Sequence, residues 1–363
     1  MSVDGISVID LKDGPPTLIR QDAPPATSNP SPADAGGDAA TLDAASPDAS
    51  GGDGSAGDAQ APSTGGHKAA AGAPTAGSVA PDVSFTPDGA YALERRDGLA
   101  SITVDSLADG TLTTIPLPSA PTDLTVSAAG DFAVAVLRDT SSVVLLPIPG
   151  VVGNPDGITT IPVAGPTVGR ALVTNQGKSV VLFTTVVPVQ SITVLDLGSS
   201  TAHTLPLHAP VQAVFPSSDG QYAIVLHQVT PNPGSAQGAF SVVPIGQPLP
   251  AVIQSLPAPP TAVAVSKDRA IVSIRSDSNS TYGLYMALMP SLDVRQYTLA
   301  SPPIAVGIAA GAGRGYAAQD YAEGRITFVD LTEGGPPDGG GGFSAITITG
   351  FELNAGIVVG AGK

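Results

Sequence analysis

The sequence predicts an all-β protein, a seven-bladed β-propeller, and three observations lead to this prediction. Short runs rich in Val, Ile and Thr recur along the chain and are bounded by Gly, Pro and Asp, which is typical of β-strands. Equivalent turn residues stand at 89, 130, 177, 220, 268 and 313, a spacing of 41 to 48 residues. That period matches one four-stranded propeller blade. No helical 3.6-residue period competes with the runs.

The composition favours many turns and a core of small side chains. The 363 residues include 43 Gly and 36 Pro, whereas aromatic residues make up only 4% and Trp is absent. Gly and Pro interrupt helices and form turns. We therefore expect β-branched and small side chains to fill the interior.

The charge and the cysteine content exclude several classes of function. The formal net charge is −16, which repels phosphate backbones and anionic lipids, so we expect no nucleic-acid partner. Cys is absent, which excludes disulfides, thiolate zinc sites and a Cys nucleophile. No apolar run reaches the ~18 residues of a membrane-spanning helix. We expect no cofactor, no metal site and a monomer.

Each repeat begins with two strands joined by a turn. The copies are "DVSFTPDGAYAL", "DLTVSAAGDFAVAV", "ALVTNQGKSVVLF" and "QAVFPSSDGQYAIVL", with looser copies at 262–274 and 307–318. A third run follows in each unit, as in "ASITVDSL", "SITVLDL" and "RITFVDL", and a weaker fourth run closes it. Four strands per unit give six complete blades.

The two ends of the chain predict a seventh, shared blade. "ISVIDL" (6–11) matches the third-strand runs, "PTLIR" (16–20) follows as a fourth strand, and "AGIVVGAGK" (355–363) copies the first-strand run at 306–314. Sharing one blade between both ends closes a ring and removes exposed sheet edges. A second strand is missing from this blade. We expect the natural chain to extend upstream, supplying that strand and an export signal; the alternative is a three-stranded blade.

Residues 21–78 form a tract of Ala, Asp, Gly, Pro and Ser with almost no large apolar side chain. Burial there cannot offset an ordering cost of about 1–2 kcal/mol per residue. We predict three parts: N-terminal strands of the closing blade (1–20), a disordered spacer (21–78) that either shades the channel mouth or acts as a tether, and the propeller (79–363).

The "PDG" turns and the "SITVLDL"-like strands resemble the bacterial YVTN and lactonase-like β-propeller repeats. The resemblance covers nearly all of the chain outside 21–78, and its clearest copies are "SFTPDGAYAL", "FPSSDGQYAIVL", "SITVLDL" and "RITFVDL". The spacer is similar to those that follow the lipidated Cys of exported lipoproteins, although no Cys is present here. The resemblance implies a periplasmic, extracellular or surface-tethered propeller.

Candidate binding residues lie on the face formed by the loops between second and third strands. Counting seven residues past each turn residue gives Arg96, Leu137, Thr184, His227, Arg275 and Asp320. We predict that Arg96, His227, Arg275 and Asp320 form a ligand-binding ring at the central channel. The alternative is that these strand ends are polar simply because they meet water.

Asp residues recur at the ends of third strands, namely Asp10, Asp196 and Asp330, with Asp105 close by. We interpret them as acceptors that cap turns and not as catalytic carboxylates.

Three classes of function remain: a non-enzymatic module that binds a protein, peptide or glycan through the loop face; a lactonase-like hydrolase on the central face; and a structural envelope protein. The chain has only four His, which is a poor supply of general bases. We therefore favour the binding module and predict no catalytic residue.

Overall fold

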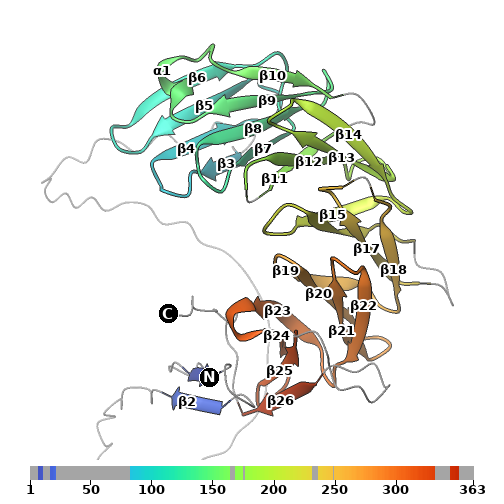
Figure 1. The fold of residues 1–363 in the computed structure, drawn as a ribbon. Coiled ribbons are helices and arrows are strands. Elements are labelled where there is room, and N and C mark those ends of the chain that lie inside the picture. Colours follow the sequence, from blue (N-terminus) through green and yellow to red (C-terminus); the bar gives the residue numbers. More distant parts are fainter. Residues whose placement is uncertain are drawn as a thin grey trace, which may run out of the picture. The chain divides into compact units, whose positions relative to one another are not determined.

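The computed structural model describes residues 82–163, 168–174, 176–230, 236–247, 249–331 and 344–350, and the backbone of two strands near the N-terminus. The described residues form six four-stranded sheets and one two-stranded sheet (Figure 1). Each four-stranded sheet is an antiparallel meander of four consecutive strands. These are the six complete blades that the repeat predicted, and the chain is a β-propeller.

The first three blades consist of β3 (Asp82–Phe85), β4 (Tyr91–Arg95), β5 (Ser101–Ser106) and β6 (Thr111–Pro116); β7 (Asp123–Val126), β8 (Phe132–Leu137), β9 (Ser142–Pro147) and β10 (Thr159–Pro162); and β11 (Arg170–Val173), β12 (Ser179–Phe183), β13 (Ser191–Asp196) and β14 (Thr201–Pro206). The next three consist of β15 (Val211–Pro216), β16 (Tyr222–His227), β17 (Gly238–Pro244) and β18 (Val252–Leu256); β19 (Pro260–Val265), β20 (Arg269–Ser276), β21 (Thr281–Leu288) and β22 (Asp293–Thr298); and β23 (Pro303–Ala309), β24 (Arg314–Gln319), β25 (Arg325–Asp330) and β26 (Ala345–Thr349).

Two short helical turns interrupt the strands, α1 (Gly150–Gly153) and the 3-10 turn η1 (Ala310–Ala312), and the sequence pattern predicted neither. Val151 of α1 is fully buried among the side chains of the first two blades. Within the described part of the chain, no helix is long and apolar enough to cross a membrane.

The hydrophobic core lies between adjacent blades. On β8, Ala133 and Ala135 pack toward the preceding blade while Val134 and Val136 pack toward the following one. Successive strand residues point to opposite faces of a sheet, so a continuous apolar run fits a blade that is covered on both faces. Five clusters of this kind join each described blade to the next.

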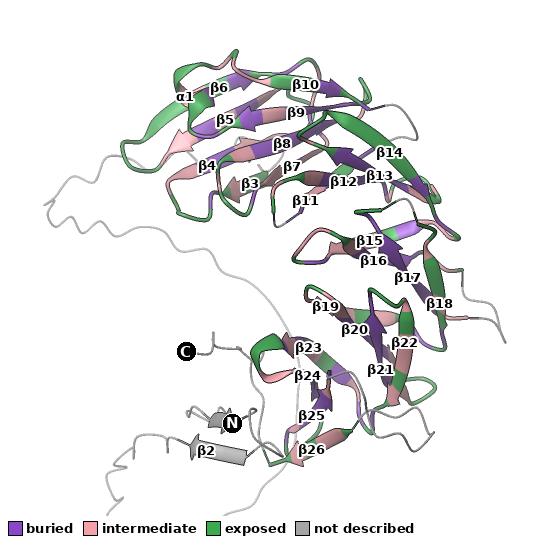
Figure 2. Cartoon of the chain, viewed as in Figure 1, coloured by how far each residue is buried: buried purple, intermediate pink, exposed green. Residues whose placement is uncertain are grey.

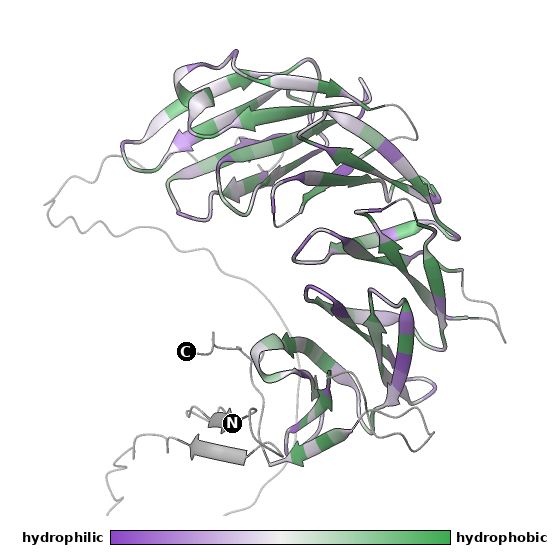
Figure 3. Ribbon diagram, viewed as in Figure 1, coloured by the Kyte–Doolittle hydropathy of each residue, from purple (hydrophilic) through white to green (hydrophobic). Residues whose placement is uncertain are grey.

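Burial changes across each blade in the same way. The second and third strands are largely buried, as in β8 and β17, whereas the fourth strands β6 and β14 are mostly exposed (Figure 2). Hydropathy follows burial, with the most apolar stretches on the central strands (Figure 3). The weak fourth run of each repeat is therefore the outer strand, which meets solvent on at least one side.

The turn between the first and second strands is held by one recurring set of bonds. Thr86 donates its hydroxyl to Asp88 at 2.6 Å, and the same Asp88 oxygen accepts the Ala90 N–H at 3.0 Å. These hydrogen bonds lower the pKa of Asp88, and the bond from Thr86 has the largest effect. Gly89 takes the left-handed φ of +70° that closes the turn. The "PDG" signal is thus a turn signal.

The two strands near the N-terminus, β1 (Ser7–Asp10) and β2 (Thr17–Gln21), pair antiparallel with Val8 opposite Arg20. They belong to the same unit of the chain as the six blades. The predicted third and fourth strands of a closing blade are therefore present as strands. The expected partner run at 355–363 and the predicted spacer at 21–78 lie outside the described residues, except for Gln21 at the end of β2.

Candidate functional site

We define the loop face as the described loops that join second to third strands: 96–100, 138–141, 184–190, 228–230 with 236–237, 277–280 and 320–324. Because all blades have the same strand order, these loops leave the same end of their sheets. Arg95 Nη1 donates to Pro121 O at 3.1 Å, and Gln228 Nε2 donates to Thr185 O at 3.3 Å. These bonds join the loop ends of neighbouring blades.

Arg96 lies on this face and Arg275 lies near the end of β20, just before the 277–280 loop; each is engaged by a nearby carboxylate. The guanidinium of Arg96 pairs with Glu94, and its side chain is 42% exposed. Arg275 Nε lies 2.9 Å from Asp277 Oδ1, with a second bond from Nη2 to Oδ2. Exposed pairs of this kind contribute little to stability, so both cations stay available for exchange with another anion.

His227 is buried at the end of β16, with only 2% of its surface exposed. Its Nδ1 lies 3.3 Å from the Pro210 carbonyl and must donate, so Nε2 accepts the Ser241 hydroxyl at 2.7 Å. Burial lowers the pKa of His227, against smaller opposing effects from backbone hydrogen bonds. His227 therefore holds strand ends together from beneath the loop face.

Asp320 follows the end of β24 and acts electrostatically on Arg275. The hydrogen bond that Arg275 donates to Asp277 is the largest cause of its raised pKa, and the negative charges of Asp277 and Asp320 raise this pKa further. The structure thus brings Asp320 and Arg275 of adjacent blades within electrostatic range.

The counted equivalence of the six ring positions is wrong in the last two blades. The same bulge sits opposite His227, Ile274 and Gln319, so these three residues are equivalent, and Arg275 and Asp320 each lie one residue further on. In the fifth blade the turn is shorter: Ser266 N bonds to Arg269 O, whereas Ser217 N bonds to Tyr222 O. Counting a fixed number of residues from the turn residue does not account for this shorter turn.

Sequence reasoning missed a polar network beneath the last loop. Gln319 is 1% exposed; its Oε1 accepts from Ser301 Oγ at 3.1 Å, and its Nε2 donates to Thr327 Oγ1 at 2.6 Å. Arg325 also donates to Ser301, and its guanidinium lies 3.8 Å above the Tyr321 ring. The network fixes the position of Tyr321 on the loop face. The only signal of this network in the sequence was the presence of isolated polar residues in an apolar run.

Large apolar side chains stand exposed on the loop face. Val186 is 70% exposed, Leu99 52%, and Val187 and Tyr321 42% each. They come from three loops; Tyr321 directly follows Asp320, and Leu99 lies three residues after Arg96. Exposed apolar groups mixed with charge are typical of surfaces that bind other proteins.

The opposite end of the blades carries a polar crevice of about 230 Å³ between the third and fourth blades. Its lining includes Thr174, Lys178, Asp196, His203, Asp219 and Gln221. Asp196 accepts the Ser199 N–H at 2.7 Å and the Ser199 hydroxyl at 2.8 Å, which lowers the Asp196 pKa. Asp196 is thus a turn cap, as predicted, and Asp219 accepts the turn hydroxyl of Ser217.

Metal-binding geometry is absent from the described residues, where no three His, Cys, Asp or Glu side chains come together as ligands.

Comparison with known proteins gives distant structural likenesses. No family model matches the chain, and no curated protein matches it. Among solved structures, hydrazine synthase of Kuenenia stuttgartiensis is similar over 69% of this chain and 76% of its own, with 15% identity and a TM-score of 0.43. The β-propeller domain of Cps50 (Swd1) from Myceliophteria thermophila is similar over 74% and 86%, with 11% identity and a TM-score of 0.42. The fold assignment rests on the six sheets themselves.

Proposed function

We propose that this protein is a non-enzymatic binding module that holds a protein or peptide partner on its loop face. The observation that carries the proposal is the set of exposed apolar side chains on that face: Leu99, Val186, Val187 and Tyr321. Burying such groups against a partner supplies about 25 cal/mol per Å² of apolar surface.

The charged residues of the loop face fit the same proposal. Arg96 and Asp320 in the loops and Arg275 at the end of β20 offer polar contacts, and His227 supports the face from below through Ser241. A protein interface commonly combines a few apolar anchors with a polar rim. The net charge of −16 favours a partner with a basic surface.

Capture of the partner in cells tests the proposal. We would cross-link the full-length chain in its native host and identify what is attached. A Val186→Asp, Val187→Asp double variant places charge on the loop face and should lose the captured protein. The matched control is Leu249→Asp, which alters an exposed residue at the opposite end of a blade (49% exposed) and should keep it. Equal capture by both variants would overturn the proposal.

An assay on simple lactones tests the proposal that the protein is not an enzyme. The resemblance of the repeats to lactonase-like propellers makes lactones the first substrates to try. Hydrolysis above the buffer rate would overturn our assignment in favour of a hydrolase.

We further propose that the protein is exported and tethered at the cell surface as a monomer, which the YVTN-like repeats and the lipoprotein-like spacer support. Cell fractionation with intact-mass analysis and terminal peptide mapping tests this. An unextended chain found in the cytoplasm would contradict it.

A further inference from the structure

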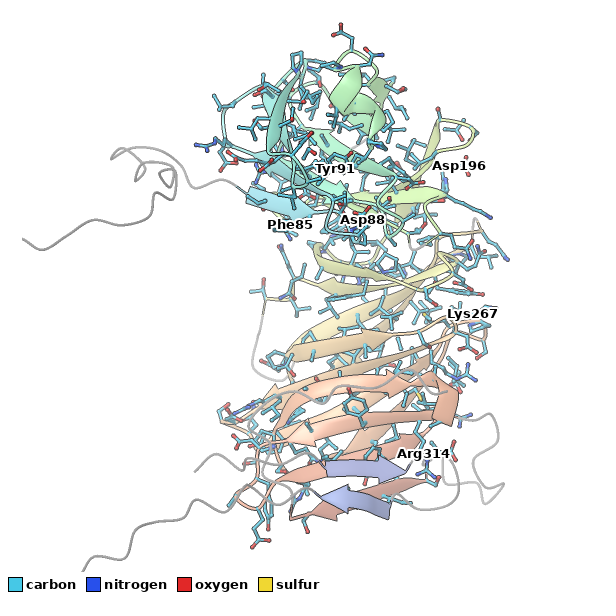
Figure 4. The ribbon with its side chains drawn as sticks, turned by 90° about the vertical axis from the view of Figure 1, so that its left-hand side faces the viewer. Phe85, Asp88, Tyr91, Asp196, Lys267 and Arg314 are labelled. Carbon is cyan, nitrogen blue, oxygen red and sulfur yellow. The ribbon has the colours of Figure 1, made fainter. Side chains whose placement is uncertain are left out.

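The first blade, β3–β6, has one face that no other described sheet covers. Its other face packs on the second blade through Leu93, Ile102 and Val104. On the uncovered face, Phe85 is 61% exposed and Leu112 67% (Figure 4 labels Phe85). Large apolar side chains on a sheet face are normally covered.

The register shows what this face is built to contact. Phe85, Ala92, Asp105 and Leu112 lie directly opposite one another across the four strands. In the other five blades, the residue equivalent to Asp105 is apolar, at most 2% exposed, and part of the cluster shared with the preceding blade: Leu146, Leu195, Val243, Ala287 and Val329. The uncovered face is therefore the one that receives a preceding blade.

Asp105 differs from its equivalents by its charge. Its Oδ1 is buried, yet it accepts no hydrogen bond from any group that the structure describes. Asp196 is the last residue of β13 and caps a turn, whereas Asp105 lies one residue before the end of β5 and caps no turn in the described part of the chain, which corrects the sequence-based interpretation for this residue. A buried carboxylate oxygen without a donor is costly, so a donor on whatever covers this face would stabilise it.

The turn glycines also indicate that a preceding blade is missing from this face among the described residues. A Cβ at Gly130 or Gly220 would lie 3.1 Å and 3.0 Å from atoms of the preceding blade's turn, Pro87 and Thr174 respectively. A Cβ at Gly89, the equivalent glycine of the first blade, would meet nothing within 4 Å.

The N-terminal hairpin carries a matching pattern. Its β1 residues "SVID" align with "TVLD" at 193–196, which puts Val8 at the position of Val194. Val194 belongs to the cluster that packs on the following blade. Arg20 lies opposite Val8 in the β1–β2 register and so shares that face of the hairpin. In a closed ring the following blade is β3–β6.

We propose that the uncovered face of β3–β6 is the docking surface for the hairpin β1–β2, and that Arg20 pairs with Asp105 across this seam. The seam that closes the propeller then differs from the five others, because an ion pair stands where they have apolar contacts. The proposal does not depend on the proposed function.

A charge exchange tests the pair in the full-length chain. Arg20→Asp and Asp105→Arg each place like charges together, and each should lower the Tm by a few degrees. The double variant restores opposite charges and should recover most of that loss. The control combines Arg20→Asp with Asp109→Arg, a carboxylate in the neighbouring β5–β6 turn, and should recover nothing. Additive losses in the Arg20, Asp105 double variant would overturn the pair.

Cross-linking tests the docking surface independently of the charges. The chain has no cysteine, so Val8→Cys with Ala92→Cys introduces the only two thiols. Their equivalents, Val194 and Ala223, share one cluster. A short bismaleimide should join the two positions within one chain, whereas the control pair Val8→Cys with Leu249→Cys should stay unlinked. Links only between chains would show that a second copy covers this face, and absence of any link would also overturn the proposal.

Discussion

His227 shows how a polar residue near a binding face can serve the fold. Its ring bridges the Pro210 carbonyl and the Ser241 hydroxyl, and Ser241 itself is fully buried. Removing the ring leaves that hydroxyl without a partner. We expect His227→Ala to cost about 1–3 kcal/mol of unfolding free energy, measured by urea denaturation.

The lowered pKa of His227 predicts a dependence of stability on pH. The unfolded chain titrates this group near 6.5 and the folded chain titrates it lower, so the unfolded state binds more protons between the two values. Stability from this group is complete above 6.5 and is lost as the pH falls through 6.5 toward the folded pKa. The Tm should fall less between about pH 7.5 and pH 5.5 in His227→Gln, which keeps a donor and an acceptor. An identical fall in both proteins would exclude His227 as the source.

Arg275 is expected to contact the bound partner. Its pair with Asp277 is exposed, so Arg275→Ala should leave the Tm nearly unchanged. Binding of the captured partner, measured by titration calorimetry, should weaken by a factor of about 2–5, as removal of a rim charge commonly does. Unchanged affinity would remove Arg275 from the interface.

At the scale of the element, the turn glycines differ in what surrounds them. Gly89 and Gly220 both have φ near +70°, so alanine at either position costs about 1–2 kcal/mol in backbone strain. At Gly220 the new Cβ would also lie 3.0 Å from Thr174, which is 2% exposed and β-branched. We expect Gly220→Ala to destabilise by about 1–3 kcal/mol more than Gly89→Ala in urea denaturation. Equal losses would mean that Thr174 moves aside freely.

Strands and turns were predictable from the sequence, because their signals are local. The alternation of Val and Thr, the "PDG" turns and the "SVID" run each identified an element that the structure contains. The contacts between blades were not predictable in this way. Asp105 and Asp196 both stand near a strand end in the sequence, but Asp196 caps a turn and Asp105 lies on the sheet face that no other described sheet covers. The buried Gln319 network depends on Ser301, eighteen residues earlier, and no local pattern reports that contact.

For the whole molecule, we expect the N-terminal part of the chain to stabilise the propeller. Deleting residues 1–20 removes Arg20 and most of the hairpin, and should lower the Tm of the entire propeller because it uncovers the face that carries Phe85. Replacing residues 23–78 by a short Gly-Ser linker should leave the Tm within a few degrees, since that tract has almost no large apolar side chain. Differential scanning calorimetry measures both. A neutral first deletion would contradict ring closure by the hairpin.

The placement of the core between blades also limits how this molecule can be divided. Five of the six apolar clusters formed by the described residues draw side chains from two neighbouring sheets, so a single blade excised from the middle of the series would carry half of two cores and complete neither. The smallest fragment that keeps one of these five shared clusters whole is a pair of adjacent blades. Gain or loss of repeats during evolution is consequently tolerable only when the two newly joined faces fit each other, and the charged face of the first blade is the least interchangeable of them.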